Sequence, residues 1–303
     1  MGIRPSTVMK VFWNTPPRDF FRLVKSKLRR GRSSHFTLID LLNSPGLLRP
    51  TKAHDFLHRY EMALARHGHW PPLDFTDKRV LELGCGPLLG FAPLAIFLGC
   101  SEYLCVEPML NMEFVQAEVL VHRYWHPLHE DLCALYGKRC TLDEFMHLLR
   151  DKVVPAPSDL PSADINGAID ISLSNSCLEH IEGLSKTLEV LAGITAPNGR
   201  FIHLVNFGSH RPARNPFQPL YSVSPESFRA KYGNKINMIR YPEMLDLFNA
   251  AGLPARMVPL YTSPYEFEGD VHPAWADRFS WEELWTKAAL IVDTTGIPTP
   301  ESA

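Results

Sequence analysis

The chain has 303 residues, of which 45% are hydrophobic and 21% are charged, and its formal net charge at pH 7 is −2. This composition is typical of a globular protein and excludes a disordered or collagen-like chain. The near-neutral charge gives no overall attraction to nucleic acid, so no nucleic-acid partner is expected. Six cysteines form no CxxC pair. With no signal peptide and no apolar run of about 20 residues, a cytoplasmic protein is expected.

Residues 1–35 are interpreted as a basic amphipathic arm. Within residues 1–32, Asp19 is the single acidic residue among many lysines and arginines. A helix would place Phe20 and Leu28 on one face and basic residues on another. Two interpretations stay open. In the first, the apolar face of the arm packs on the rest of the protein. In the second, the arm binds an anionic membrane surface, each basic residue adds about 1 kcal/mol of binding free energy, and the protein is peripheral at the inner face of the membrane.

Residues 36–77 are expected as a helical lead-in, and residues 78–262 as an α/β domain. The predicted strands are, in chain order, "KRVLELGCG", "EYLCVEP", "DKVVPAP", "GAIDISLSNS", "RFIHLVNF" and "ARMVPLYTS". Helices between them predict a doubly wound, mostly parallel sheet. A long insertion, at about 110–150, precedes the third strand. Residues 263–303 are expected as a C-terminal helical extension, in which "WEELWTKAALIV" packs as a helix.

A glycine-rich turn after the first strand indicates a nucleoside site. In "RVLELGCGPLLG" the apolar run ends at Gly84, Gly86 and Gly90, where backbone can approach a ligand without an intervening Cβ. Glu107 ends the next strand about twenty residues later, where a carboxylate can accept hydrogen bonds from both hydroxyls of a ribose. Pro87 cannot donate an N–H to phosphate, so a cofactor without phosphates fits better than a dinucleotide.

Four segments resemble the successive motifs of class I S-adenosylmethionine-dependent methyltransferases: "VLELGCGPLLG", "YLCVEP", "GAIDISLSNSCLEHIEGL" and "LAGITAPNGRFIHLVNF". The resemblance covers residues 78–207 and implies a Rossmann-like methyltransferase fold with S-adenosylmethionine as cofactor. The segment "NKINMIRYPEMLDLFNAAGL" is similar to one in many bacterial methyltransferases of this type, often near polysaccharide or lipid-glycan pathways. The insertion at 110–150 departs from the family pattern and leaves the adenine-contacting residue unassigned.

The resemblance also implies which residues contact the cofactor. Glu82 and the first two glycines would surround its methionine portion, Glu107 would hold the ribose, and the end of the fourth strand would lie beside the sulfonium. The cofactor-binding residues expected are Glu82, Gly84, Cys85, Gly86, Glu107, Pro108, Ser174 and Asn175.

Methyl transfer to a hydroxyl needs an aligned acceptor and a base for its proton. His180 and His210 follow the fourth and fifth strands, at the edge where open α/β sheets bind ligands, and are the candidate catalytic bases. A structural or solvated loop position is the alternative for each. Glu179 would orient His180 or cap the next helix. The residues expected to bind substrate are Arg211, Arg240 and Tyr241.

The remaining histidines are given structural interpretations. His203 lies inside a predicted strand and is expected to be a core residue. His122, His126 and His129 have helical spacing, but Pro127 is expected to interrupt that helix and no cysteine or carboxylate trio completes a site, so no metal is expected.

The expected function is O-methylation of a sugar-containing or other small-molecule or lipid-linked hydroxylated metabolite. N-methylation is the alternative enzyme activity. A non-catalytic scaffold or partner subunit that binds S-adenosylmethionine is the alternative from another class.

Overall fold

A computed structural model describes residues 37–294 except residues 45, 68–72, 211–216 and 263–268, so the basic arm and Arg211 lie outside the described residues. The strands form one sheet in the order β3-β2-β1-β4-β5-β7-β6. They are β1 (Arg79–Leu83), β2 (Glu102–Val106), β3 (Val153–Ala156), β4 (Ile169–Asn175), β5 (Thr195–Asn206), β6 (Ala255–Thr262) and β7 (Thr286–Asp293). The pairs β3-β2, β2-β1, β1-β4 and β4-β5 are parallel. The predicted doubly wound, mostly parallel sheet is therefore confirmed.

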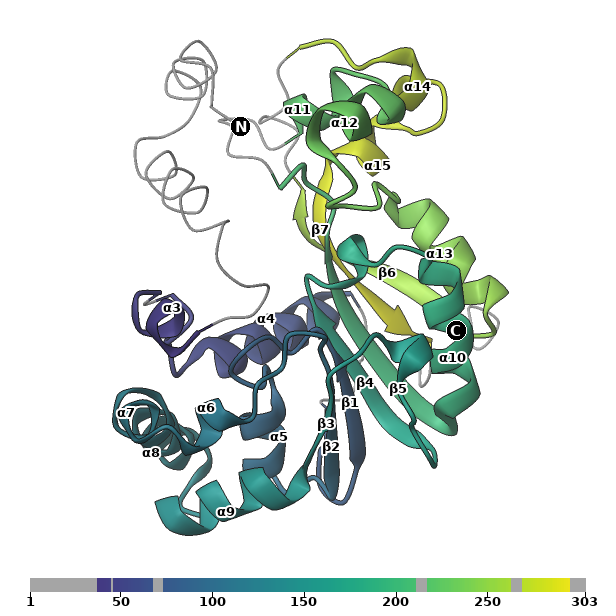
Figure 1. The fold of residues 1–303 in the computed structure, drawn as a ribbon. Helices are drawn as coiled ribbons and strands as arrows, with labels where there is room; N and C mark the ends of the chain where they lie inside the picture. Colours follow the sequence, from purple (N-terminus) through teal and green to yellow (C-terminus); the bar gives the residue numbers. More distant parts are fainter. Residues whose placement is uncertain (1–36, 45, 68–72, 211–216, 263–268, 295–303) are drawn as a thin grey trace.

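Helices cover both faces of this sheet, with α10 and α13 on one side (Figure 1). In chain order the helical elements are α3 (Leu38–Leu42), α4 (Lys52–Arg66), α5 (Ala92–Phe97), α6 (Glu113–Gln116), α7 (Glu118–Leu120), the π-helix η1 (Val121–Trp125), α8 (His126–Tyr136), α9 (Leu142–Lys152), η2 (Leu160–Ser162), η3 (Leu178–His180), α10 (Leu184–Ile194), α11 (Gln218–Tyr221), α12 (Pro225–Tyr232), α13 (Tyr241–Ala250), α14 (Pro273–Ala276) and α15 (Trp281–Trp285).

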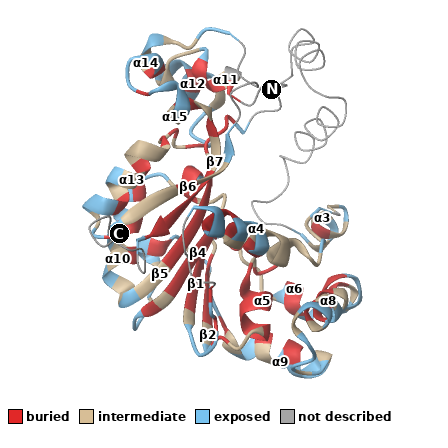
Figure 2. Cartoon of the chain, turned by 180° about the vertical axis from the view of Figure 1, so that it is seen from behind, coloured by how far each residue is buried: buried red, intermediate tan, exposed pale blue. Residues whose placement is uncertain are grey.

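The central strands are buried (Figure 2), and because helices cover both faces of the sheet their side chains are apolar on both faces. Successive side chains point to opposite sides, so alternate residues enter two different cores. Val80 and Tyr103 pack with α4, α5 and α9, whereas Leu81 and Leu104 pack with α10 and α13.

The expectation of a helical C-terminal extension is wrong for residues 286–293. The "WEELW" half of the stretch is α15, but the "TKAALIVD" half is β7, which pairs antiparallel with both β5 and β6. A short apolar run has no periodicity that separates a buried strand from a buried helix. The capping box of Ser280 and Glu283 sets the beginning of α15, and Thr286 begins the strand.

A small third core forms a cap beyond the carboxyl end of β5. It joins α11, α12, α14 and α15 (Figure 1), and most of its buried side chains are aromatic. Tyr221 and Trp275 are packed edge to face, and the Trp275 indole donates a hydrogen bond of 2.8 Å to the Val223 carbonyl. We refer to residues 217–240 and 270–285 as the cap.

The insertion at 110–150 is helical, and Pro127 does not interrupt it. The π-helix η1 leads directly into α8, and Pro127 occupies the first turn of α8. Proline removes one backbone donor from this continuous helix, and the wider π-helical turn lies at that point of the chain. Across the described ranges, no helix is long and apolar enough to cross a membrane.

Candidate functional site

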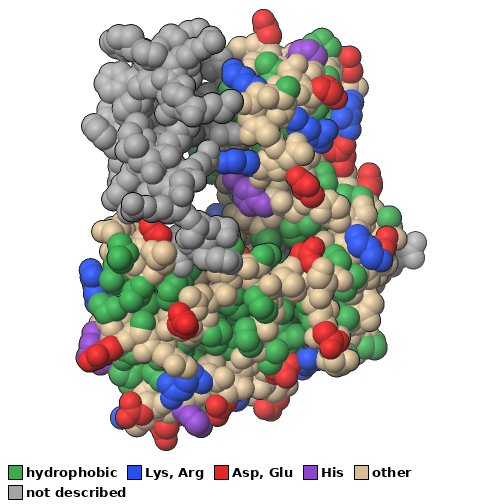
Figure 3. Space-filling view, viewed as in Figure 1, with side chains coloured by type: hydrophobic (Ala, Val, Ile, Leu, Met, Phe, Trp, Pro, Cys, Tyr) green, Lys and Arg blue, Asp and Glu red, His purple; other side chains and the backbone are tan. Residues whose placement is uncertain are grey.

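The candidate site lies where the parallel strands end. The glycine turn follows β1, Glu107 follows β2, the loop with η3 follows β4, and His210 follows β5. Open α/β sheets bind ligands at this edge. Figure 3 shows the surface hollowed between the cap and the body of the sheet, with histidine side chains at the rim of the hollow.

Glu82 lies under the glycine turn rather than facing a ligand. Its carboxylate is 1% exposed and accepts hydrogen bonds from the Phe91 N–H (2.8 Å) and the Tyr103 hydroxyl (2.6 Å). Burial raises the pKa of Glu82 to about 7. A Cβ on Gly90 would overlap this carboxylate, so glycine is required there by a close approach as well as by its positive φ. Glu82 therefore supports the turn from beneath.

The other two glycines differ in what surrounds them. A Cβ on Gly84 would lie 2.6 Å from the Cys177 sulfur, whereas a Cβ on Gly86 would meet no heavy atom within 4 Å among the described residues. Gly86 also has a φ of +67°. Its backbone therefore borders space, at the edge of the sheet, that no described residue occupies.

Glu107 lies beside this open space. One carboxylate oxygen accepts the Gly86 N–H at 3.2 Å, and the other accepts the Met109 N–H at 3.0 Å. Each carboxylate oxygen can accept more than one hydrogen bond, so this half-buried group retains acceptor capacity for ligand hydroxyls.

The remaining residues predicted to bind the cofactor differ in how far they are buried. Asn175 is half-buried at the end of β4, and Pro108 is exposed next to Glu107. Cys85 is buried, and its hydrogen bond with Cys105, together with burial, raises the pKa of its thiol. Ser174 is fully buried, with its hydroxyl 2.9 Å from His203 Nδ1. The Ser174 side chain is thus engaged inside the sheet.

His203 is a core histidine, as predicted. It is fully buried against Phe201 and Phe248, and burial lowers its pKa to about 3.

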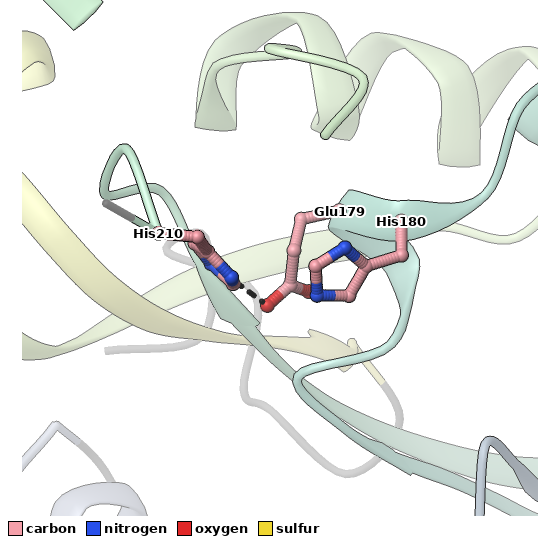
Figure 4. Close-up of side chains that lie close together, drawn as sticks. All are labelled: Glu179, His180 and His210. Carbon is pink, nitrogen blue, oxygen red and sulfur yellow. Dashed lines mark ion pairs between the residues drawn. The ribbon is translucent and has the colours of Figure 1, made fainter. Parts of the chain in front are cut away.

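Glu179, His180 and His210 come together from two loops (Figure 4). One ligand atom from each lies within 4.8 Å of the others. Glu179 Oε1 is 3.6 Å from His210 Nε2 and accepts the Asn206 N–H at 3.3 Å. The two imidazole rings are edge to face, with centroids 4.8 Å apart. Both histidines predicted at this edge are therefore placed together, and Glu179 contacts His210.

Glu179 is 3% exposed, and burial raises its pKa to about 8. It does not cap α10, whose N-cap is Gly183 with no side-chain hydrogen bond.

The cap segment 235–237 holds the β4 loop in position. His180 Nδ1 lies 2.6 Å from the Lys235 carbonyl, which can only accept, so Nδ1 is the donor and the lone pair of the neutral ring is on Nε2. The Asn237 side chain donates to the carbonyls of Leu178 (2.8 Å) and Ile181 (3.2 Å). The "NKIN" stretch therefore holds the loop after β4 in place, a role that its sequence alone does not indicate.

Arg240 is not placed to contact a substrate, contrary to the sequence prediction. Its side chain is 1% exposed and donates to the backbone carbonyls of Phe207 (2.6 Å) and Thr286 (3.2 Å). Its guanidinium also lies 5.2 Å from the centroid of the Tyr221 ring. Arg240 therefore joins α13, the end of β5 and the start of β7. Tyr241 is half-buried at the beginning of α13.

The histidines of the insertion have other partners. His126 lies 3.4 Å from Glu130, and His129 Nε2 lies 3.0 Å from the Cys140 carbonyl. A shallow groove between α6, η1 and α9, bordered by Met146 and Arg150, includes no residue of the glycine turn or of the Glu179 cluster.

Comparison with known proteins gives structural similarity alone. No protein-family model matches the chain, and no curated protein matches it. An S-adenosylmethionine-dependent methyltransferase from Mesorhizobium loti is 13% identical with a TM-score of 0.42, over 77% of this chain and 96% of that one.

Two further solved structures have different activities in their names. A phosphoethanolamine N-methyltransferase 2 from Haemonchus contortus is 14% identical with a TM-score of 0.41, over 65% of this chain and 38% of that one. A precorrin 8w decarboxylase from Methanobacterium thermoautotrophicum is 14% identical with a TM-score of 0.35, over 72% of this chain and 82% of that one. Similarity at this level does not decide an activity, because one fold hosts many chemistries.

Proposed function

We propose that this chain is an S-adenosylmethionine-dependent methyltransferase. The observation that carries the proposal is the pairing of Gly86 and Glu107 at the ends of adjacent strands. No described residue occupies the space beside the Gly86 backbone, and the Glu107 carboxylate next to it is held by two backbone N–H groups while retaining acceptor capacity. This arrangement suits a nucleoside whose ribose hydroxyls reach the carboxylate.

The turn is poorly suited to a pyrophosphate. Pro87 has no N–H, and the Phe91 N–H at the beginning of α5 already donates to Glu82. Leu88 and Leu89 are buried. A dinucleotide needs free N–H groups at this position, so a sulfonium cofactor without phosphates fits the residues better.

The Glu179 cluster supports an acceptor site next to the cofactor site. S-adenosylmethionine supplies an activated methyl group. For a hydroxyl acceptor, His180 Nε2 has a lone pair that can take the proton as the new carbon–oxygen bond forms, because its Nδ1 proton is engaged by the Lys235 carbonyl. His210, beside Glu179, is the second candidate for this role.

We infer O-methylation of a sugar-containing or lipid-linked hydroxylated compound as the reaction. The support for this acceptor class is the resemblance of the 234–253 segment, together with the basic arm outside the described residues.

The test is a screen of hydroxylated and amine-containing compounds with S-adenosylmethionine. S-adenosylhomocysteine and the methylated product are measured by mass spectrometry. Turnover with hydroxylated compounds is expected. Turnover with amines alone would replace the proposal by N-methylation. Binding of the cofactor without turnover on any compound would favour the alternative that the chain is a non-catalytic scaffold or partner subunit.

A further inference from the structure

The cluster of Glu179, His180 and His210 has the composition of a metal site. Two imidazoles and one carboxylate bind divalent transition metals in many proteins, including zinc enzymes and non-haem iron enzymes. One ligand atom from each residue lies within 4.8 Å of the other two. Ligand atoms bound about 2.0–2.2 Å from one ion are necessarily this close to each other.

Glu179 provides a second, independent observation. Its carboxylate is almost completely buried, yet its Oε2 has no hydrogen-bond partner among the described residues. Within the same ranges, no lysine or arginine forms an ion pair with it. A buried carboxylate oxygen without a partner is destabilising, and a bound cation would remove that cost.

His180 is oriented for coordination, and His210 lies beside Glu179. Histidine ligands usually donate their other ring N–H to a carbonyl or carboxylate, which fixes the tautomer. His180 has this arrangement, because its Nδ1–H donates to the Lys235 carbonyl and leaves Nε2 for an ion. His210 Nε2 lies 3.6 Å from Glu179 Oε1 and donates to the Asn206 carbonyl at 3.3 Å, so coordination through this atom requires the loss of its proton. Coordination would replace that contact.

We propose that Glu179, His180 and His210 bind one divalent transition-metal ion, with Zn²⁺ as the reference ion. Three protein ligands leave at least one position open. A hydroxyl of the acceptor bound at that position would lose its proton to solvent, and the free histidine base would be unnecessary. The two roles exclude each other, since a lone pair that coordinates an ion cannot also accept a proton. Binding of the ion itself does not depend on the proposed methyl transfer.

The test uses the untagged full chain, treated with a chelator and dialysed. Zn²⁺ is titrated by calorimetry, and bound metal is counted by mass spectrometry. We expect one tightly bound ion per chain. Glu179→Gln and His180→Ala should each weaken binding at least tenfold. His126→Ala is the matched control, because it removes a histidine from an exposed pair with Glu130 and should leave tight binding unchanged.

A second measurement keeps the test valid if a variant is less stable. Zn²⁺ should raise the melting temperature of the original chain and of His126→Ala, but not that of Glu179→Gln. Co²⁺ should give visible absorption without intense thiolate bands, which distinguishes this cluster from the six cysteines. No tight binding, equal binding by Glu179→Gln, or thiolate bands would overturn the proposal. S-adenosylhomocysteine binding to the metal-free chain tests the proposed function separately.

Discussion

Replacement of Gly86 by alanine should weaken cofactor binding as well as lower the stability of the fold. The added Cβ meets no heavy atom within 4 Å among the described residues, so the cost to folding comes from the φ of +67°. A left-handed backbone costs a non-glycine residue about 1–2 kcal/mol, and the free energy of unfolding should fall by that amount. The same methyl group extends into the space that we assign to the cofactor. We therefore expect the affinity for S-adenosylhomocysteine to fall at least tenfold, which is about 1.4 kcal/mol.

Gly252 provides the matched control. It has a φ of +82° and open space around its Cβ position, but it follows α13, away from the turn. Gly252→Ala should lower stability to a similar extent without changing affinity. Urea denaturation measures the first quantity and titration calorimetry the second. If the two variants bind S-adenosylhomocysteine with equal affinity, the open space beside Gly86 is not the cofactor site.

Three further predictions concern a core histidine, a buried hydroxyl and the arm. The folded pKa of His203 is about 3 against an ordinary 6.5, so below pH 6.5 the unfolded chain takes up a proton that the folded chain does not. Stability is therefore lost as the pH falls, by about 2 kcal/mol between pH 6.5 and pH 5. In urea denaturation, the stability of His203→Gln should fall less between pH 6.5 and pH 5 than that of the original chain. An equal fall in both would contradict the lowered pKa of His203. The Tyr60 hydroxyl is buried without a partner among the described residues, so Tyr60→Phe should leave the unfolding free energy unchanged or raise it by about 1–3 kcal/mol; a clear decrease would show a missed partner. The intact chain should sediment with anionic vesicles at low salt more than a chain starting near residue 33; binding that ignores charge and salt would leave the arm as a packed extension.

The sequence was informative where a local pattern has one physical meaning. Apolar runs that end at glycine or an acidic residue predicted the parallel strands and their carboxyl ends. Glu107 was placed at the edge of the sheet from its position after β2 alone. The same reasoning placed both His180 and His210 at that edge.

The sequence was less informative where long-range packing decides. β7 lies between β5 and β6 through antiparallel pairing with both, which its apolar run alone does not reveal. The sequence predicts Arg240 as a substrate-binding residue, but contacts with the end of β5 and the start of β7 bury it. Glu179 became a central residue only when the fold placed its carboxylate beside His210.

The most direct test of the central claim is titration calorimetry of the full chain with S-adenosylhomocysteine and, separately, with NAD. We expect saturable binding of S-adenosylhomocysteine, no binding of NAD, and a loss of about 1–3 kcal/mol of binding free energy in Glu107→Ala, because ligand hydroxyls lose their acceptor. Equal affinity for NAD, or an unchanged affinity in Glu107→Ala, would contradict the claim that the ends of β1 and β2 hold this cofactor.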